Sequence, residues 1–85
     1  MEEEIGHITH YFSKINVGVI ELDKGELKVG DTIHIKGYTT GFYQKVASLQ
    51  IEHQSAQSIK KGESAGIKVE NPVREHDLVL LVKEN

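Results

Sequence analysis

The aromatic side chains of this 85-residue chain gather in two short segments, residues 10–14 and 38–45, which also carry lysines. A ring beside an ammonium group suits single-stranded nucleic acid, because stacking on a base contributes about 1–3 kcal/mol and the cation meets a phosphate. Tyrosine, with an apolar body and a polar tip, also suits a protein partner. Alternatively, the rings serve the fold, with Phe12 and Phe42 filling the ends of the core. If the segments form a contact surface, its residues are His10, Tyr11, Lys14, Tyr38, Thr39, Thr40, Tyr43 and Lys45.

The five histidines raise the question of a metal site. His7 and His10 are three residues apart, and residues at that spacing point to opposite faces of a regular strand, so one ion would not reach both. The chain has no cysteine, which excludes a disulfide and a zinc–thiolate site. We expect His34 and His53 at outward-facing strand positions. The sequence therefore predicts no metal and no cofactor.

The motifs of common catalytic sites are also missing. No serine stands in a G-x-S-x-G turn, and there is no G-x-x-x-x-G-K-[ST] phosphate loop. Catalysis by a pair of carboxylates is not excluded at this point, since the sequence does not give the distance between two carboxylates in space. A small packed barrel leaves little room for a pocket that excludes water. We therefore expect a protein that is not an enzyme.

Charge and hydropathy favour an ordinary soluble domain. Ten basic residues against thirteen acidic ones give a formal charge of −3, which is not the overall signature of a nucleic-acid binder. The acidic residues concentrate near the two ends of the chain, so the overall charge does not exclude a locally basic face formed by residues 13–61. The N-terminal residues resemble no secretory signal, and no apolar run approaches the roughly 20 residues of a membrane span. We expect a cytoplasmic protein without a membrane segment.

Short stretches rich in β-branched residues, separated by turn residues, indicate β-strands. Within residues 42–53 the apolar positions change face, which indicates a bulge or a barrel corner. The polar stretch 54–60 is expected to form one helical turn around Ala56 and Ile59. The strands are expected at residues 5–12, 17–22, 32–36, 42–53, 64–69 and 77–83.

Six or seven short strands without a long helix predict an all-β sandwich or barrel. Closure is favoured at this size, because a closed barrel has no exposed strand edges. We therefore expect an all-β fold, a single small closed six- to seven-stranded β-barrel over residues 5–85. Residues 1–4 are expected to form an acidic N-terminal tail.

A run of glycine turns and alternating apolar residues resembles a known barrel. The sequence G-E-L-K-V-G-D at residues 25–31 is similar to the linker between two strands in the second domain of translational GTPases such as elongation factor Tu. Residues 45–51, 61–69 and 73–79 resemble later strands of that domain in the same order, with His76 in place of the usual glycine. The resemblance implies the elongation-factor domain-2 type of barrel and a role near tRNA or the ribosome.

A second resemblance covers more specific motifs. Residues 6–17, G-H-I-T-H-Y-F-S-K-I-N-V, and residues 36–53 are similar to the C-terminal barrel of the collagenase-like peptidase family. Some members of that family are implicated in tRNA and rRNA modification. The resemblance implies an accessory barrel without the catalytic part, as a binding module that contacts tRNA or ribosomal RNA. The alternative is a protein-interaction module that docks on a separately encoded partner enzyme, with no direct RNA contact.

Overall fold

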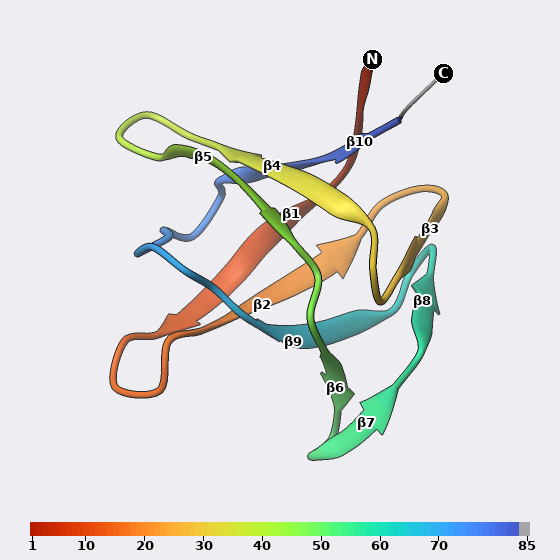
Figure 1. Ribbon diagram of the computed structural model, residues 1–85. Helices are drawn as coiled ribbons and strands as arrows, with labels where there is room; N and C mark the ends of the chain where they lie inside the picture. The colour runs from red at the N-terminus through yellow and green to blue at the C-terminus, as the bar shows by residue number, and fades with distance from the viewer. Residues whose placement is uncertain (84–85) are drawn as a thin grey trace.

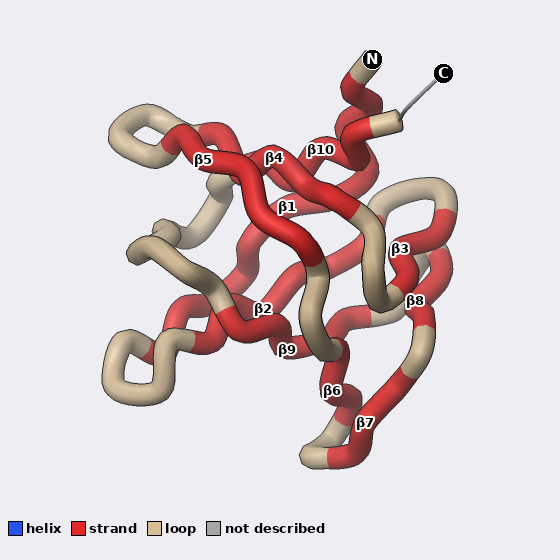
Figure 2. Tube along the Cα trace, in the orientation of Figure 1, coloured by secondary structure: helices blue, strands red, loops and turns tan. Residues whose placement is uncertain are grey.

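The computed structural model describes residues 1–83, and within that range every regular element is a β-strand (Figure 2). The strands are short, and tight turns join most of them. Positive φ angles at Gly25, Gly30 and Gly62 fit glycine's freedom in such turns. The elements are β1 (Glu2–Phe12), β2 (Val17–Leu22), β3 (Glu26–Lys28), β4 (Thr32–Lys36), β5 (Gly41–Lys45), β6 (Leu49–Ile51), β7 (Gln54–Ala56), β8 (Ser58–Lys60), β9 (Ser64–Lys68) and β10 (Leu78–Val82).

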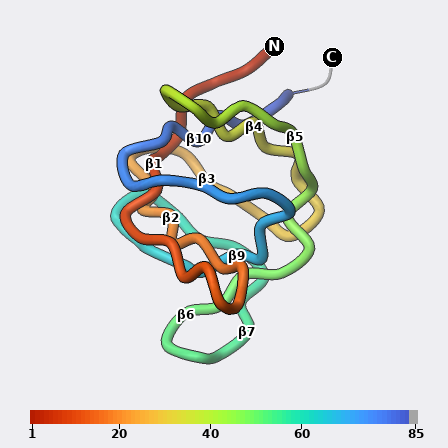
Figure 3. The backbone as a smooth tube through the Cα atoms, turned by 90° about the vertical axis from the view of Figure 1, so that its left-hand side faces the viewer, coloured from red at the N-terminus to blue at the C-terminus, as the bar shows by residue number. Residues whose placement is uncertain are grey.

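Eight of these strands form one curled antiparallel sheet in the order β5-β4-β10-β1-β2-β9-β6-β7, and β3 pairs with β8 in a separate ribbon (Figure 1). The strands expected at residues 5–12, 17–22, 32–36, 64–69 and 77–83 are confirmed with small shifts of their ends. Two hairpins, β1–β2 and β6–β7, lie at the end of the molecule away from the N-terminus (Figure 3).

The core follows from strict alternation along the strands. β4 buries Ile33 and Ile35 and leaves Thr32 and His34 partly exposed, so one face of the strand points inward. Each such side chain contributes about 1.5–3 kcal/mol when removed from water. The remaining buried apolar residues are Ile5, Ile8, Ile20, Leu22, Leu27, Val46, Leu49, Ile59, Ala65, Ile67, Val69, Val73 and Val79.

The closed barrel expected from the sequence is wrong, because the described sheet ends at β5 on one side and at β7 on the other, and β5 does not pair with β9. The strand expected over residues 42–53 stops at Lys45, and Val46 instead exchanges backbone hydrogen bonds with Gly30 and Asp31 at 2.8 Å each. The chain resumes as β6 only at Leu49, which gives ten strands rather than six or seven. The elongation-factor type of barrel is therefore not confirmed, although the all-β class is.

A side chain bridges this open seam. The Gln44 amide donates from Nε2 to the Lys68 carbonyl at 2.8 Å, and its Oε1 accepts from the Glu70 amide at 2.9 Å. The side-chain amide thus offers the donor and acceptor that a neighbouring strand would offer. Gln44 is buried, so these bonds satisfy polar groups that water does not reach freely.

The helical turn expected over residues 54–60 is also wrong. These residues form β7 and β8, and Ile59 of β8 lies opposite Leu27 of β3. Both side chains are fully buried, so the apolar pair holds the segment extended. Tertiary packing overrides the local polarity on which the helical expectation was based.

The acidic residues at the N-terminus are part of the sheet. Glu2, Glu3 and Glu4, which the sequence placed in a tail, belong to β1 and pair with residues 80–82 of β10. Glu2 accepts hydrogen bonds from Tyr43 and His34. The division of the chain into a tail and one domain stays a prediction.

Candidate functional site

Three of the eight predicted contact residues meet in one cleft. Tyr11, Thr39 and Thr40 line it together with Arg74, on the side of the sheet where β1 approaches the loop before β5. Tyr11 packs partly against the core, and Thr40 is buried. The cleft therefore offers one cation and a partly covered ring.

The other predicted residues lie elsewhere. His10 faces away from Tyr11, and its ring contacts that of Phe12 in a tilted arrangement with 4.5 Å between ring centroids. Tyr43 stacks on His34 at 4.2 Å. Tyr38 stands fully exposed in the loop between β4 and β5. Lys14 lies in the β1–β2 turn and Lys45 ends β5. Contact roles for these residues stay predictions.

A more apolar groove lies at the end of the molecule that carries the two hairpins. Phe12 and Ile15 of the β1–β2 hairpin form one wall, and they are 46% and 56% exposed. Val17 and Val19 of β2 continue it, and Ile51 of β6 contributes from the opposite side. The groove encloses about 590 Å³ and is open to solvent. It was not among the predicted sites.

The expectation that Phe12 fills the end of the core is wrong, and a β-bulge explains why. The register of β1 against β2 shifts between Ile8 and His10. A bulge inserts one residue and reverses the faces of the residues that follow. Tyr11 therefore turns toward the core, while His10 and Phe12 turn outward. Phe42 of β5 is partly buried against the core, as a core role requires.

The floor of the groove is hollow because it contains a glycine. Gly66 of β9 lies between Val19 of β2 and Gln50 of β6 in the sheet. A Cβ at this position would lie 3.1 Å from Cγ1 of Val17, closer than an ordinary contact. The missing side chain therefore leaves the space that the groove occupies.

The rim of the groove is acidic. Glu52 and His53 form the β6–β7 turn, and Glu63 immediately precedes β9. The Glu63 carboxylate accepts a hydrogen bond from the Lys60 amide at 2.7 Å. Within residues 1–83, no lysine or arginine lines the groove. An apolar surface with negative charge at its edge is the result.

The contacts that shift pKa values lie away from the groove. The Tyr43 hydroxyl, followed by the His34 ring, lowers the pKa of Glu2, since both donate to its carboxylate. The same hydrogen bond raises the pKa of Tyr43. A hydrogen bond from Lys83 lowers the pKa of Glu3. These contacts hold the start of β1 against its neighbours and suggest no catalytic role.

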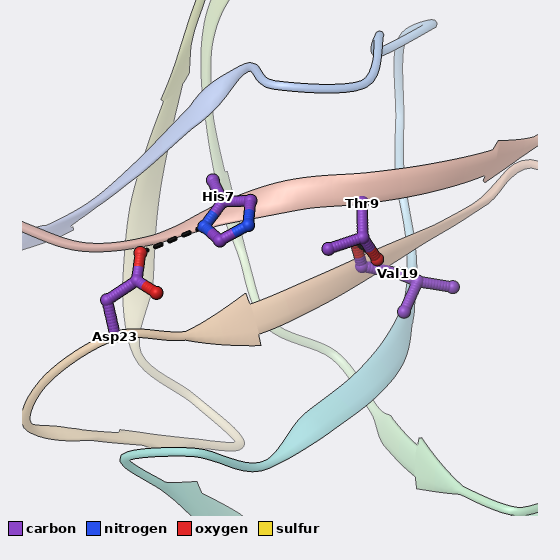
Figure 4. Close-up of polar contacts among 4 residues, drawn as sticks. All are labelled: His7, Thr9, Val19 and Asp23. Carbon is purple, nitrogen blue, oxygen red and sulfur yellow. Dashed lines mark hydrogen bonds and ion pairs between the residues drawn. The ribbon is translucent and has the colours of Figure 1, made fainter.

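One group of metal-ligating side chains occurs in the described part of the chain. Ligand atoms of His7, Glu21 and Asp23 lie within 4.8 Å of one another. His7 faces Glu21 across β1 and β2, and its Nδ1 lies 2.9 Å from the Asp23 carboxylate (Figure 4). His10 is not in the group. Because Asp23 already partners the imidazole, we assign no metal here, and the absence of one stays a prediction.

Sequence comparisons connect the chain to proteins named as proteases. No protein-family model matches it. It is 46% identical over 82 residues to an uncharacterized protease of Methanocaldococcus jannaschii and 39% identical over 74 residues to a collagenase of Porphyromonas gingivalis. The alignments cover 95% and 86% of this chain. The chain spans about one fifth of the length of these curated relatives, 20% in each case.

Solved structures define the class of fold. The C-terminal domain of a Geobacillus thermoleovorans U32 peptidase matches with a TM-score of 0.87 and 14% identity, over 95% of this chain and 93% of that one. Its selenomethionine variant matches with a TM-score of 0.84 and 15% identity, over 91% and 96%. The chain thus has the fold of a U32-peptidase C-terminal domain. The expected resemblance to a C-terminal domain of collagenase-like peptidases is supported by both comparisons.

The expectation that the protein is not an enzyme needs correction. The relatives are named protease and collagenase, which connects the chain to enzymes. The match covers only about 20% of each relative, so the catalytic activity lies elsewhere in those proteins. Catalytic motifs of those relatives would lie in the four fifths of their length that this chain does not match.

In the described residues, no helix has the length and apolar character needed to cross a membrane. The cytoplasmic location stays a prediction.

Proposed function

We propose that this chain acts as an accessory domain of a peptidase-like protein, and that the apolar groove docks it on the remaining part of that protein. One observation carries the proposal: Phe12 and Ile15 stand exposed beside a glycine-floored hollow. The relatives supply a candidate occupant, because four fifths of their length lies outside the match.

The groove suits a protein surface on physical grounds. Contiguous exposed apolar area marks interaction sites more often than single exposed residues do. Phe12 and Ile15 are already about half buried, so covering the rest of each would contribute roughly half of the 1.5–3 kcal/mol that full burial gives. Apart from Ile15, which lies in the β1–β2 turn, the apolar walls belong to strands of one sheet, so little ordering entropy opposes docking. Val29 and Tyr38 are also exposed, but neither lines the groove.

A chimera tests the proposal. This chain replaces the matching 82 residues of the M. jannaschii protease, and calorimetry follows its melting transition. If the groove docks on the protease part, the transition lies about 5 °C or more above that of the isolated chain, because docking stabilises the folded domain. The isolated chain is a sound reference, since a domain of the same fold forms a chain of nearly the same extent.

Variants identify the surface. Changing Phe12 and Ile15 together to serine should lower the isolated chain's melting temperature only modestly, because both side chains are about half exposed, and the isolated variant is the reference for the variant chimera. In the chimera the same change should abolish the upward shift. Tyr38→Ser, an exposed aromatic outside the groove, serves as the control and should retain the shift. A chimera in which the serine variant keeps the full shift would contradict the proposal.

Nucleic-acid contact is a second candidate, favoured by one observation. Tyr11, Thr39 and Thr40 share a cleft with Arg74, beside the exposed ring of Tyr38. An NMR titration with total tRNA tests it, with salt as the variable. Shifts confined to these residues that fade as salt rises would support contact with tRNA. Ribosomal RNA fragments provide the parallel probe, and an absence of shifts with either would remove RNA as a ligand.

A further inference from the structure

We infer that the β6–β7 turn makes the groove selective for an apolar segment that carries lysine or arginine beside its anchoring side chain. The inference rests on the proposed docking function and specifies the chemistry of the docked surface. The occupant is a segment of the peptidase part with an apolar anchor and an adjacent basic residue.

The charges at the groove favour such an occupant. Glu52 lines the groove and forms no ion pair within residues 1–83. Glu63 also lines it, with one carboxylate oxygen bonded to the Lys60 amide. No basic side chain from the described residues lining the groove offsets them. An acidic partner residue would therefore meet like charge, and a basic one would meet a carboxylate.

The turn backbone fixes where these groups lie. Glu52 and His53 both have positive φ, 50° and 67°, a region that residues with side chains seldom occupy. Two consecutive left-handed residues form the kind of turn that favours Asn-Gly. Strained residues of this kind concentrate at functional sites. Here the strained pair lines the groove itself, which places a carboxylate at its edge.

The hairpin that carries the turn has a short backbone connection to the rest of the sheet, and Leu49 anchors it in the core. Gln50 pairs with Gly66, and this is the register pair that joins β6 to β9 in the described residues. β6 otherwise pairs with β7, through Leu49, Gln50 and Ile51. The position of Glu52 is thus set mainly by its own hairpin, while Phe12 and Ile15 stand on a separate one (Figure 1). The apolar anchors therefore lie on the β1–β2 hairpin and the selecting carboxylate on the β6–β7 hairpin. Mutations can change one without the other.

Three synthetic peptides test the inference on the isolated chain. Each has a central Leu-Phe pair, flanked on both sides by lysine, by glutamine or by glutamate. NMR titration gives the dissociation constant and the shifted residues. We expect the lysine peptide to bind about threefold more tightly than the glutamine peptide, as exposed charge pairs allow, and the glutamate peptide to bind most weakly. The preference should shrink as salt rises.

Matched variants assign the preference to the turn. Glu52→Gln should remove most of the difference between the lysine and glutamine peptides. Glu70→Gln, an exposed acid outside the groove, should leave the difference intact. Equal affinities, a preference for the glutamate peptide, unchanged selectivity in Glu52→Gln, or no binding of any peptide would each overturn the inference.

The outcome is distinguishable from that of the docking test. Suppose that the chimera shows the upward shift, that the shift is lost when Phe12 and Ile15 are changed to serine, and that the peptides bind without a charge preference. The docking function then stands, and the inferred selectivity for a basic segment is wrong. If the chimera shows no shift, the proposed function falls whatever the peptides do.

Discussion

Gly66 and Val17 define the depth of the docking groove. A Cβ built on Gly66 would lie 3.1 Å from Cγ1 of Val17, so any larger residue must displace its neighbour slightly. The two residues stand on adjacent strands, β9 and β2, beneath the exposed side chains of the β1–β2 hairpin. The absence of a side chain at one strand position thus creates the hollow on which the proposed function depends.

Filling this hollow should block docking with little effect on folding. Gly66→Val adds a strand-favouring side chain but crowds Val17, so we expect a change of about 1 kcal/mol or less in unfolding free energy. In the chimera the upward shift of the melting transition should be lost. Gly41→Val is the matched control, because a Cβ there meets nothing within 4 Å. If the Gly66→Val chimera kept the upward shift of its melting transition, docking through the groove would be contradicted.

The Gln44 bridge should be a strong determinant of stability. Gln44→Leu keeps the side chain's approximate size but leaves the Lys68 carbonyl and the Glu70 amide without their partner. We expect a loss of about 2–3 kcal/mol in urea unfolding, since orphaned buried polar groups are costly. Gln54→Leu, at an exposed position, should change stability by no more than about 0.5 kcal/mol. Equal effects of the two changes would refute this role.

Relaxing the β6–β7 turn should stabilise the chain. Replacing Glu52 by Asn and His53 by Gly supplies residues that accept the left-handed conformation already present. We expect about 1 kcal/mol or more of added stability, seen as a rise of about 4–8 °C in melting temperature. The same variant should lose the preference for the lysine peptide, since it removes the rim carboxylate. A lower melting temperature would show that the turn is not strained.

The contact between Glu2 and Tyr43 should make stability depend on pH. The lowered pKa of Glu2 means that its contribution is complete above the ordinary value of 4.5 and is lost as pH falls through the lowered value. The raised pKa of Tyr43 means that its contribution is complete below 10.0 and is lost as pH rises through the raised value. Glu2→Gln should therefore lower the melting temperature at pH 7, and the difference from wild type should narrow as the solution is acidified below 4.5.

Glu4→Gln provides the comparison for this experiment. Glu4 lies on the same strand and takes part in no ion pair in the described part of the chain. Its substitution should have the smaller effect at pH 7. If the difference in melting temperature between the wild type and Glu2→Gln stayed constant down to pH 3, the pH-dependent contribution assigned to Glu2 would be wrong.

The strands could be predicted from the sequence because their apolar residues alternate, as Ile33 and Ile35 do in β4. The openness of the sheet could not, since it depends on Val46 bonding to a distant turn and on a buried glutamine acting in place of a strand. Local pattern carries no signal for either contact.

The groove escaped prediction because one bulge turned Phe12 outward. A signal was present: the β1–β2 segment carries Val17 and Val19 on one face and Ile20 and Leu22 on the other, which is more apolar surface than one core requires. His76 was the other informative residue. It stands where the resembled pattern has glycine, and its positive φ of 76° shows why glycine suits that position.

Covalent footprinting with a photoactivated carbene measures whether the groove is covered when the chain is joined to a protease part. Labelling of Phe12 and Ile15 is compared between the isolated chain and the chimera with the M. jannaschii protease, with exposed Tyr38 as the internal reference. We expect strong labelling of Phe12 and Ile15 in the isolated chain and clear protection in the chimera, while Tyr38 is labelled equally in both. Equal labelling of Phe12 and Ile15 in the two proteins would mean that the groove stays open to water, and would contradict docking.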